Sequence, residues 1–288
     1  MNFFKKHKKA IIITGSILLF FVILIILAFT VFSLKNVEIN CLTSKIEISE
    51  QMEEEIASEI DLGGTVLFKD KEKMTKEIEN KYPYVKVVNI ETVFPNKFVI
   101  NIAERESLFL FEDVLLDSEL KVLEKGVNKG IRLNILNLEF NTENISSGQF
   151  LNFEELKSQT SESVGTQIEE ILTKFASICN LNNKNVSDVK NLFSEIKIEY
   201  YTDFRDGELK LNLKLIDKNN FEVNVYNPLE HYENKLYKMF YAYSDVYSST
   251  PEKVENSKLT VYTKLNGEDQ AILETAWNVC KNFVFEII

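Results

Sequence analysis

The chain has few of the residues on which most enzyme chemistry depends. Its 288 residues include two histidines, three cysteines and nine glycines. His7 lies in the basic N-terminal segment, so a Ser–His–Asp or Cys–His site elsewhere would require His231, which we interpret as an exposed first-turn helix residue. Nine glycines leave little room for a phosphate-binding loop, and no spacing of ligand residues is typical of a metal site. The sequence therefore predicts no enzyme, no catalytic residue, no cofactor and no bound metal.

The cysteines are too few and too scattered for a disulfide framework. Cys41, Cys179 and Cys280 each lie among apolar residues. We expect each of them to be buried as a small apolar side chain.

One short motif does suggest catalysis. Ser194 and Lys197 form an S-x-x-K string, the spacing that brings a lysine to a nucleophilic serine on one helical turn. The string leads directly into EIKIEYY, whose alternation predicts a strand, and on a strand these two side chains lie on opposite faces. The companion Lys-Thr-Gly and Ser-Asp-Asn strings are missing, so we interpret the match as coincidence.

Charge and hydropathy set the N-terminus apart from the rest. Residues 1–9 carry four lysines and no acid, and Ala10 to Phe32 contains no charged residue. A helix of that length extends about 34 Å, which exceeds a hydrocarbon thickness of about 30 Å. The run is too long for a cleaved signal peptide, and the preceding lysines favour a cytoplasmic N-terminus. We predict a cytoplasmic tail (1–9) and a transmembrane helix (10–34), hence a single-pass type II protein of the cell membrane; an uncleaved targeting segment is the alternative.

The remainder of the chain is acidic. Beyond the four N-terminal lysines there are 29 basic against 44 acidic residues. This excess of negative charge disfavours binding of nucleic acid and electrostatic adsorption to anionic lipid. The roughly 250 residues beyond the helix suffice for two ordinary domains.

Residues 35–106 have the pattern of a small α+β domain with the order strand, helix, helix, strand, strand. Ser49 and Asp70 are suited to cap the two helices, and Phe94-Pro95-Asn96 supplies the turn between the last two strands. The residues expected to face the core are Met52, Ile56, Ile60, Met74 and Ile78 of the helices, Val88, Ile90 and Thr92 of one strand, and Phe98, Ile100 and Ile102 of the next.

The segment PYVKVVNIETVFPNKFVINIAERE, with the preceding helix pair, resembles the POTRA domain of the FtsQ/DivIB family of bacterial division proteins. That pattern is Pro-aromatic-Val, a strand, an apolar-Pro turn, a second strand and Glu-Arg. The matching positions are Pro83, Tyr84, Val85, Pro95, Ile100, Glu104 and Arg105. We interpret Glu104 and Arg105 as an ion pair at the strand end. Two positions depart from the family: Ser107 replaces a common proline, and Leu120 a usual glycine.

Residues 107–266 are predicted to form a larger mixed α/β domain with a C-terminal antiparallel sheet. Thr166-Gln167-Ile168-Glu169 has the form of a capping box, and Asn227 is suited to cap a helix over Leu229–Tyr243. The polar stretch 128–161 is interpreted as linker or loops. Strands are expected at 196–200, 209–215, 221–225 and, last, in SKLTVYTKL around Leu259–Leu265, with a tight antiparallel connection at 217–220.

The resemblance extends to the end of this domain, where a Lys-Leu pair (Lys235-Leu236) lies in the helix before the final strand. It implies a septal scaffold of the divisome that captures small coiled-coil division proteins, FtsB/DivIC and FtsL. A last strand with a free edge would accept a strand from such a partner. The expected partner-binding residues are Leu259, Val261, Tyr262, Thr263, Lys264, Leu265, Gly267 and Lys235, with Tyr262 and Lys264 on the face opposite the apolar ones.

Residues 267–288 form a C-terminal tail whose apolar spacing favours a helix, packed on the second domain or offered to a partner or membrane. The spaced residues are Ile272, Leu273, Ala276, Trp277, Cys280, Phe283, Val284 and Ile287. Two other functions are weighed against the division scaffold. One is a membrane-anchored POTRA-containing assembly factor of another envelope machine, such as a secretion or sporulation channel. The other, an anchored wall hydrolase or transpeptidase, is disfavoured because its nucleophile set is missing.

Overall fold

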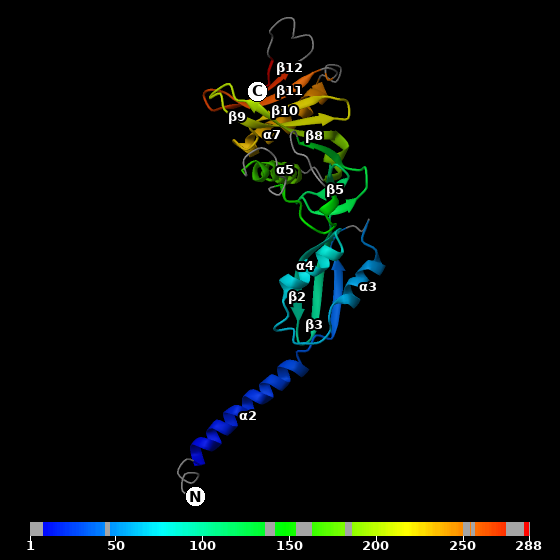
Figure 1. The fold of residues 1–288 in the computed structure, drawn as a ribbon, viewed down its shortest axis with the longest axis vertical. Coiled ribbons are helices and arrows are strands. Elements are labelled where there is room, and N and C mark those ends of the chain that lie inside the picture. The colour runs from blue at the N-terminus through cyan, green and yellow to red at the C-terminus, as the bar shows by residue number, and fades with distance from the viewer. Residues whose placement is uncertain are drawn as a thin grey trace. The chain divides into compact units, whose positions relative to one another are not determined.

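The computed structural model describes residues 8–43, 47–135, 142–153, 163–181, 186–249, 254, 257–274 and 285–287. The chain divides into two compact units, Met1–Arg105 and Glu106–Ile288. Figure 1 traces the chain through both units. Together they form a mixed α+β protein, as predicted.

The first unit opens with helix α2 (Lys8–Thr30), whose described side chains are mostly apolar and exposed. The helix ends four residues before the predicted boundary because Phe32 and Leu34 pair with the loop at 64–66. Val66 N–H donates to the Phe32 carbonyl (2.8 Å), and Leu34 N–H donates to the Gly64 carbonyl (2.9 Å). Across the described residues, no helix combines the length and the apolar character needed to cross a membrane. The transmembrane helix and the type II topology therefore stay predictions.

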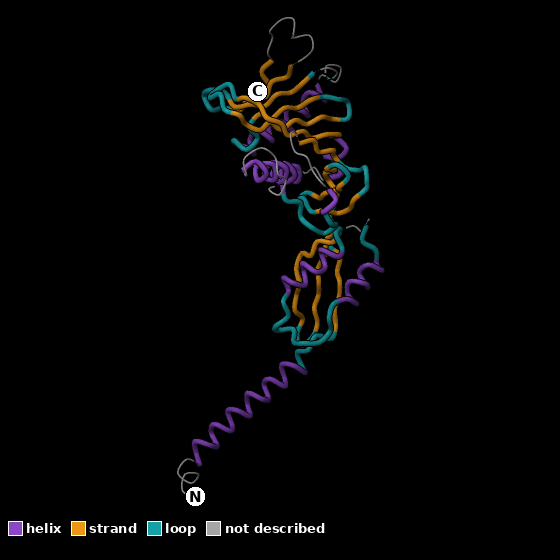
Figure 2. Tube along the Cα trace, viewed as in Figure 1, coloured by secondary structure: helices purple, strands orange, loops and turns teal. Residues whose placement is uncertain are grey.

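The rest of the first unit is a three-stranded sheet covered on one face by two helices (Figure 2). The elements are β1 (Asn36–Cys41), α3 (Glu50–Glu59), α4 (Lys71–Lys81), β2 (Val85–Val93) and β3 (Lys97–Glu104). The central strand is β3, which pairs in parallel with β1 and antiparallel with β2. The predicted order of strand, helix, helix, strand, strand is confirmed.

Both predicted helix caps of this unit are confirmed. The Ser49 hydroxyl accepts from the Met52 N–H (3.2 Å) and the Asp70 carboxylate from the Lys73 N–H (3.0 Å). Each side chain satisfies one of the N–H groups that a helix start leaves unpaired. Most of the expected core residues are buried, among them Ile56, Met74, Ile78, Phe98, Ile100 and Ile102, whereas Met52 and Thr92 are half-buried.

The predicted inner face of β2 is wrong in part. Val88 is 49% exposed, whereas Val85, Val87 and Ile90 are buried. The register against β3 shifts between Val87 and Asn89, so Val88 is the extra residue of a bulge. A bulge interrupts the alternation of faces, and the sequence pattern has no mark for it.

The second unit is built on a ten-stranded sheet with the order β13-β12-β11-β10-β9-β8-β7-β4-β5-β6. Its strands are β4 (Ser107–Phe111), β5 (Val114–Asp117), β6 (Val122–Lys125), β7 (Ile131–Ile135), β8 (Phe193–Thr202), β9 (Leu209–Asp217), β10 (Glu222–Tyr226), β11 (Lys258–Thr263), β12 (Asp269–Glu274) and β13 (Phe285–Ile287). A short 3-10 turn η1 (Thr142–Asn144) follows β7. β9 and β10 pair antiparallel across the predicted tight turn, as expected.

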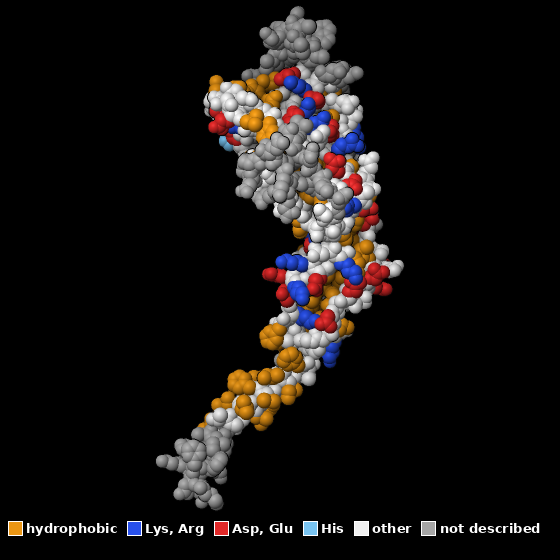
Figure 3. Space-filling view, in the orientation of Figure 1, with side chains coloured by type: hydrophobic (Ala, Val, Ile, Leu, Met, Phe, Trp, Pro, Cys, Tyr) orange, Lys and Arg blue, Asp and Glu red, His pale blue; other side chains and the backbone are white. Residues whose placement is uncertain are grey.

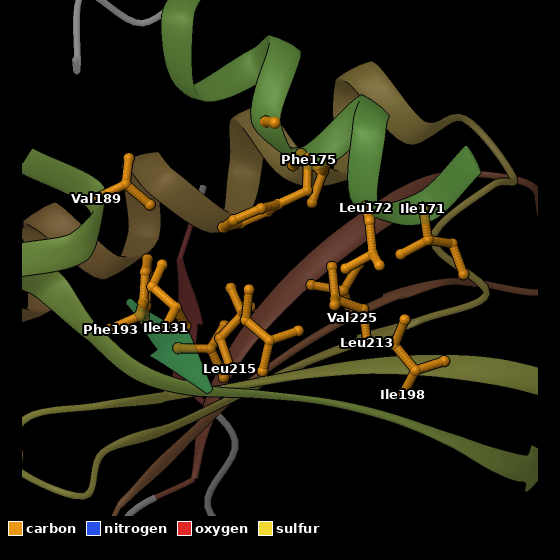
Figure 4. Packing of buried hydrophobic residues seen from close by; sticks show 14 of the residues in the cluster. Ile131, Ile171, Leu172, Phe175, Val189, Phe193, Ile198, Leu213, Leu215 and Val225 are labelled. Atoms are coloured by element: carbon orange, nitrogen blue, oxygen red, sulfur yellow. The ribbon is translucent and has the colours of Figure 1, made fainter. Parts of the chain in front are cut away.

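Helices α5 (Ser163–Leu181), α6 (Val186–Leu192) and α7 (Tyr232–Ser249) complete this unit. Figure 1 shows α5 and α7 on the same side of the sheet. Between α5 and the strands, Leu172 points toward Leu213 and Val225 (Figure 4), and the Phe175 ring lies 6.4 Å from the Phe193 ring. Leu172, Phe175, Leu213 and Val225 are all fully buried. Cys179 in α5 is buried, as expected, while Cys41 is half-buried and Cys280 lies outside the described residues.

Several predicted boundaries of the second unit are wrong. The stretch 128–161 contains strand β7, in which Ile131, Leu133 and Ile135 are buried, so it is not linker throughout. Helix α5 begins at Ser163, ahead of the predicted capping box, and the Glu169 carboxylate accepts from the Phe153 N–H (2.7 Å). Helix α7 begins at Tyr232 because Asn227 and His231 have left-handed φ angles of 45° and 54°.

Candidate functional site

The C-terminal hairpin, β11 and β12, holds most of the residues predicted to bind a partner. β11 pairs in parallel with β10 and antiparallel with β12. Both of its edges are therefore occupied by strands of the same domain, and the predicted free edge at this strand is wrong. The error arose because residues 269–274 were expected to begin a helix, whereas they form β12. The other tail residues, Ala276, Trp277, Cys280, Phe283 and Val284, lie outside the described residues.

Three of the predicted contact residues face the core. Leu259 and Val261 are 0% exposed and Thr263 is 3% exposed. α7 packs on β10, β11 and β12, and these side chains lie in that layer. They stabilise the hairpin and are not accessible to a partner in this conformation.

The other predicted residues of the hairpin lie at the surface. Tyr262 is half-buried, and the Phe204 ring lies 6.2 Å from its ring in an edge contact. In the loop that joins β11 to β12, Leu265 is 81% exposed and Gly267 has a φ of 84° that favours glycine. Lys264 N–H donates to the Glu268 carbonyl (2.8 Å), which closes the loop. Phe204, Tyr262, Lys264 and Leu265 are called here the loop-end surface.

A buried carboxylate fixes this hairpin to α7. Asp269, the first residue of β12, accepts from the Thr263 hydroxyl (2.8 Å) and from the Asn234 amide (2.6 Å). His231 Nδ1 lies 3.5 Å from the same carboxylate, and the Lys238 ammonium donates to the Asp269 carbonyl (2.7 Å). His231 is thus placed beside a structural acid; it is exposed, as expected, but it directly precedes α7 and is not a residue of its first turn.

Lys235 is not at the surface. Its side chain is 0% exposed, and its ammonium donates to the carbonyls of Tyr226 (2.9 Å) and Asn227 (3.0 Å). The Glu230 carboxylate lies 3.5 Å away. Burial lowers the pKa of Lys235 below its ordinary value. The lysine therefore holds the turn before α7 in place, and burial keeps it out of reach in this conformation, so its role as a direct partner contact stays a prediction.

An ion cluster stands next to this lysine. The Arg205 guanidinium binds the Glu230 carboxylate through two nitrogens, at 2.9 and 2.6 Å, and the Asp203 carboxylate at 2.7 Å. The hydrogen bond from Arg205 lowers the pKa of Glu230 to about 2, and the same guanidinium lowers the pKa of Asp203. Such paired, bidentate bonds are rigid. The cluster fixes the β8–β9 loop that carries Phe204.

The residues of the family pattern in the first unit have structural roles. Val85 is 0% exposed, the Tyr84 carbonyl accepts from the Arg105 N–H (2.8 Å), and Pro83 lies before β2. Pro95 lies in the β2–β3 turn, where the Asn96 carbonyl accepts from the Lys35 N–H (2.9 Å).

The predicted ion pair between Glu104 and Arg105 is wrong. Arg105, which is 6% exposed, binds the Glu79 carboxylate of α4 at 2.9 Å. Glu104 instead accepts from the Glu47 N–H (3.1 Å). Neighbouring residues of a strand point to opposite faces, so the partners of each come from elsewhere in the fold.

The one catalytic motif is part of a strand. The Ser194 hydroxyl donates to the carbonyls of Ile216 and Asp217, both at 3.1 Å, and the Lys197 ammonium lies 3.4 Å from the Glu195 carboxylate. Ser194 is therefore bound to backbone rather than activated by the lysine. Among the described residues, no group of three or more His, Cys, Asp or Glu could hold a metal ion.

The arrangement of β1, α3, α4, β2 and β3 defines the first unit as a POTRA-type α+β domain. Residues 32–105, about a quarter of the chain, match the family model described as "POTRA domain, FtsQ-type". The match confirms the FtsQ-type POTRA domain and supports the resemblance to the FtsQ/DivIB family. This domain type indicates a division-related scaffold role that works through protein–protein interaction. A search of curated proteins gave no match.

Sequence reasoning missed three side chains that shape the hairpin. Phe204 contacts Tyr262, 58 residues further along the chain, Asp269 binds Asn234, 35 residues away, and Arg205 binds Glu230, 25 residues away. The signal that was available is local: Asp203 to Asp206 is a dense run of charge directly after a strand, which marks a structured loop rather than a solvated one.

Proposed function

We propose that the chain is a non-enzymatic scaffold of the division machinery, held in the cell membrane by residues 10–34. The tail 1–9 lies in the cytoplasm, and the POTRA domain (35–106), the second domain (107–266) and the tail (267–288) lie outside. The observation that carries the proposal is an FtsQ-type POTRA domain that begins directly after a charge-free run of 23 residues, Ala10 to Phe32.

The proposed partners are the coiled-coil division proteins of the FtsB/DivIC and FtsL type. The interface is placed at the loop-end surface and the adjoining edge of β12. Leu265 and Phe204 are 81% and 65% exposed, and large apolar side chains of this exposure are suited to partner contact. β13 pairs with Ala271, Ile272 and Leu273, three of the six residues of β12. A short covering strand of this kind leaves room for an added strand from a partner.

The interface is tested by pull-down of the coiled-coil partners with Leu265→Asp. A charge in the centre of an apolar contact loses its hydration, so we expect recovery of the partners to fall at least tenfold. The matched control is Phe150→Asp. Phe150 is 57% exposed in the same domain, but it forms a β-bridge with Lys121 at the β5–β6 connection and so does not belong to the loop-end surface. Equal recovery with both variants would place the interface elsewhere.

Localisation separates division from another envelope machine. A fluorescent fusion is expected to gather at the septum, and distribution over the whole envelope would favour a secretion or sporulation assembly factor. Labelling with a fluorescent beta-lactam tests the enzymatic alternative. We expect no labelling, since the Ser194 hydroxyl donates to two backbone carbonyls.

A further inference from the structure

One end of the POTRA domain carries apolar side chains that the domain does not bury. Five of them come from two loops: Leu62, Leu67 and Phe68 between α3 and α4, and Val93 and Phe94 at the β2–β3 turn. Their exposed fractions are 54%, 46%, 78%, 44% and 62%. These five residues are called here the apolar rim. Single exposed apolar residues are ordinary on protein surfaces, but a group of five at one end of a small domain calls for an explanation.

Hydrogen bonds fix both loops to the segment that follows α2. Gly63 N–H donates to the Leu34 carbonyl (3.0 Å) and Val66 N–H to the Phe32 carbonyl (2.8 Å). On the other side, Lys35 N–H donates to the Asn96 carbonyl (2.9 Å). The rim therefore lies at the place where the apolar helix joins the domain.

Side-chain packing continues this connection. The Phe32 ring, two residues beyond the end of α2, lies 6.1 Å from the Phe94 ring at an interplanar angle of 90°. In Figure 3, hydrophobic side chains cover α2 and reappear at the adjoining end of the domain. Apolar surface thus runs from the helix onto the rim, where Phe68 and Phe94 offer large apolar side chains of the kind that interfacial segments bury at the headgroup boundary.

The charges around the rim suit the same boundary. Asp61, the acid next to Leu62, is bound by the Lys69 ammonium at 3.1 Å, and Lys97 pairs with Glu38. Lys35 is exposed and directly follows the apolar segment. Lysines at such a position extend toward lipid headgroups while their methylenes remain in apolar surroundings. The acidic excess of the whole chain is therefore not repeated at this end.

We propose that the apolar rim rests in the interfacial layer of the outer leaflet, so that lipid contact holds the POTRA domain against the membrane. The inference rests on the membrane anchor proposed above. It assigns Phe68 and Phe94 a lipid-binding role in addition to that of α2. A domain held at two loops as well as by its helix has a restricted orientation at the surface, because three attachment points define a plane.

The proposal is tested with full-length chain in vesicles of phosphatidylcholine and phosphatidylglycerol whose acyl chains are brominated. Tryptophan is introduced by Phe68→Trp and Phe94→Trp, and the parent chain, whose one tryptophan is Trp277, supplies the background to subtract. The matched control is Val88→Trp, because Val88 is 49% exposed on β2 but lies about 20 Å from Phe94 along the strand. We expect bromine to quench the added fluorescence at 68 and 94 at least twofold more than at 88.

Flotation of the same vesicles distinguishes the two proposals. If the chain floats with the vesicles but tryptophan at 68 and 94 is quenched no more than at 88, the rim does not touch lipid. The inference is then overturned while the proposed anchor stands, and the rim would be a surface for another protein. If the chain does not float, anchor and rim contact both fall. A second measurement, the thermal unfolding of each variant, shows that the POTRA domain remains folded.

Discussion

At the residue scale, two aspartates build hairpin turns of the same form. Asp117 accepts from the N–H groups of Glu119 and Lys121, and Asp217 from those of Asn219 and Phe221, all within 2.7–2.8 Å. The left-handed position of each turn is Leu120 (φ 64°) in one and Asn220 (φ 62°) in the other. Side-chain oxygens that bind the backbone two and four residues onward fix such turns.

The left-handed positions give the first prediction. Leu120→Gly should relieve about 1 kcal/mol of backbone strain but remove a side chain that is 3% exposed, which costs roughly 2–5 kcal/mol, so the free energy of unfolding should fall by about 1–4 kcal/mol. Asn220→Gly, at an exposed position, should change it by less than about 0.5 kcal/mol. Urea denaturation measures both. Equal losses would mean that the Leu120 side chain adds nothing to the core.

The ion cluster gives the second prediction, which concerns acid. The pKa of Glu230 is lowered to about 2 from an ordinary 4.5, so its stabilisation is present above about 4.5 and is lost as the pH falls toward 2. The lowered pKa of Asp203 adds in the same direction. We expect Glu230 to contribute at most about 3 kcal/mol of acid sensitivity. In Arg205→Gln the urea midpoint should fall less steeply over this pH range; an unchanged slope would contradict the pairing.

Local residues were predictable from the sequence and distant partners were not. Ser49 and Asp70 were recognised as caps because a cap binds a backbone group three residues onward. The partner of Arg105 is Glu79, 26 residues away, and no spacing rule connects them. The sequence analysis therefore predicted an acidic partner for Arg105 but named the neighbouring Glu104, whereas the structure pairs it with Glu79.

At the element scale, the C-terminal hairpin shows why period alone was misleading. Ile272 and Leu273 fit the apolar spacing of a helix, but Ala271 and Leu273 also fit the two-residue spacing of a strand. The strand forms because all six residues of β12 pair with residues of β11. The order of elements in the POTRA domain was predicted fully, since each of its strands and helices has its own turn or cap. For the residues predicted to bind a partner, the structure tests only their exposure: Leu265 is exposed and Tyr262 half-buried, but the free edge assigned to β11 does not exist.

The connection between α7 and β12 gives the third prediction. Asp269→Ala removes an acceptor from Thr263 and Asn234 in a buried place, which should cost about 2–4 kcal/mol of unfolding free energy. The control is Glu268→Ala, a neighbouring exposed loop acid expected to cost less than about 0.5 kcal/mol. Hydrogen exchange should rise in β12 for the first variant alone. Protection equal to that of the parent would show that the carboxylate does not hold the strand.

At the scale of the whole molecule, the two compact units should unfold separately. Each has its own core, with Phe98 in the first and Phe175 in the second, both 0% exposed. Phe98→Ala should lower the stability of the POTRA domain by about 3–5 kcal/mol and leave the second domain unchanged. Calorimetry of the full chain in detergent should show one transition move and one stay. Movement of both by the same amount would mean that the chain unfolds as a single unit.

The order of strands in the large sheet has a consequence for biosynthesis. From β7 to β13, every strand lies beside the one that precedes it in the chain. A polypeptide that emerges N-terminus first can therefore extend its sheet at one growing border, without waiting for a distant segment. The hairpin at residues 258–274 is laid down after β4 to β10, so the proposed loop-end surface forms only once that part of the sheet has been synthesised. Limited proteolysis of chains truncated after Ser249 should reveal a protected fragment that already contains β4 to β10.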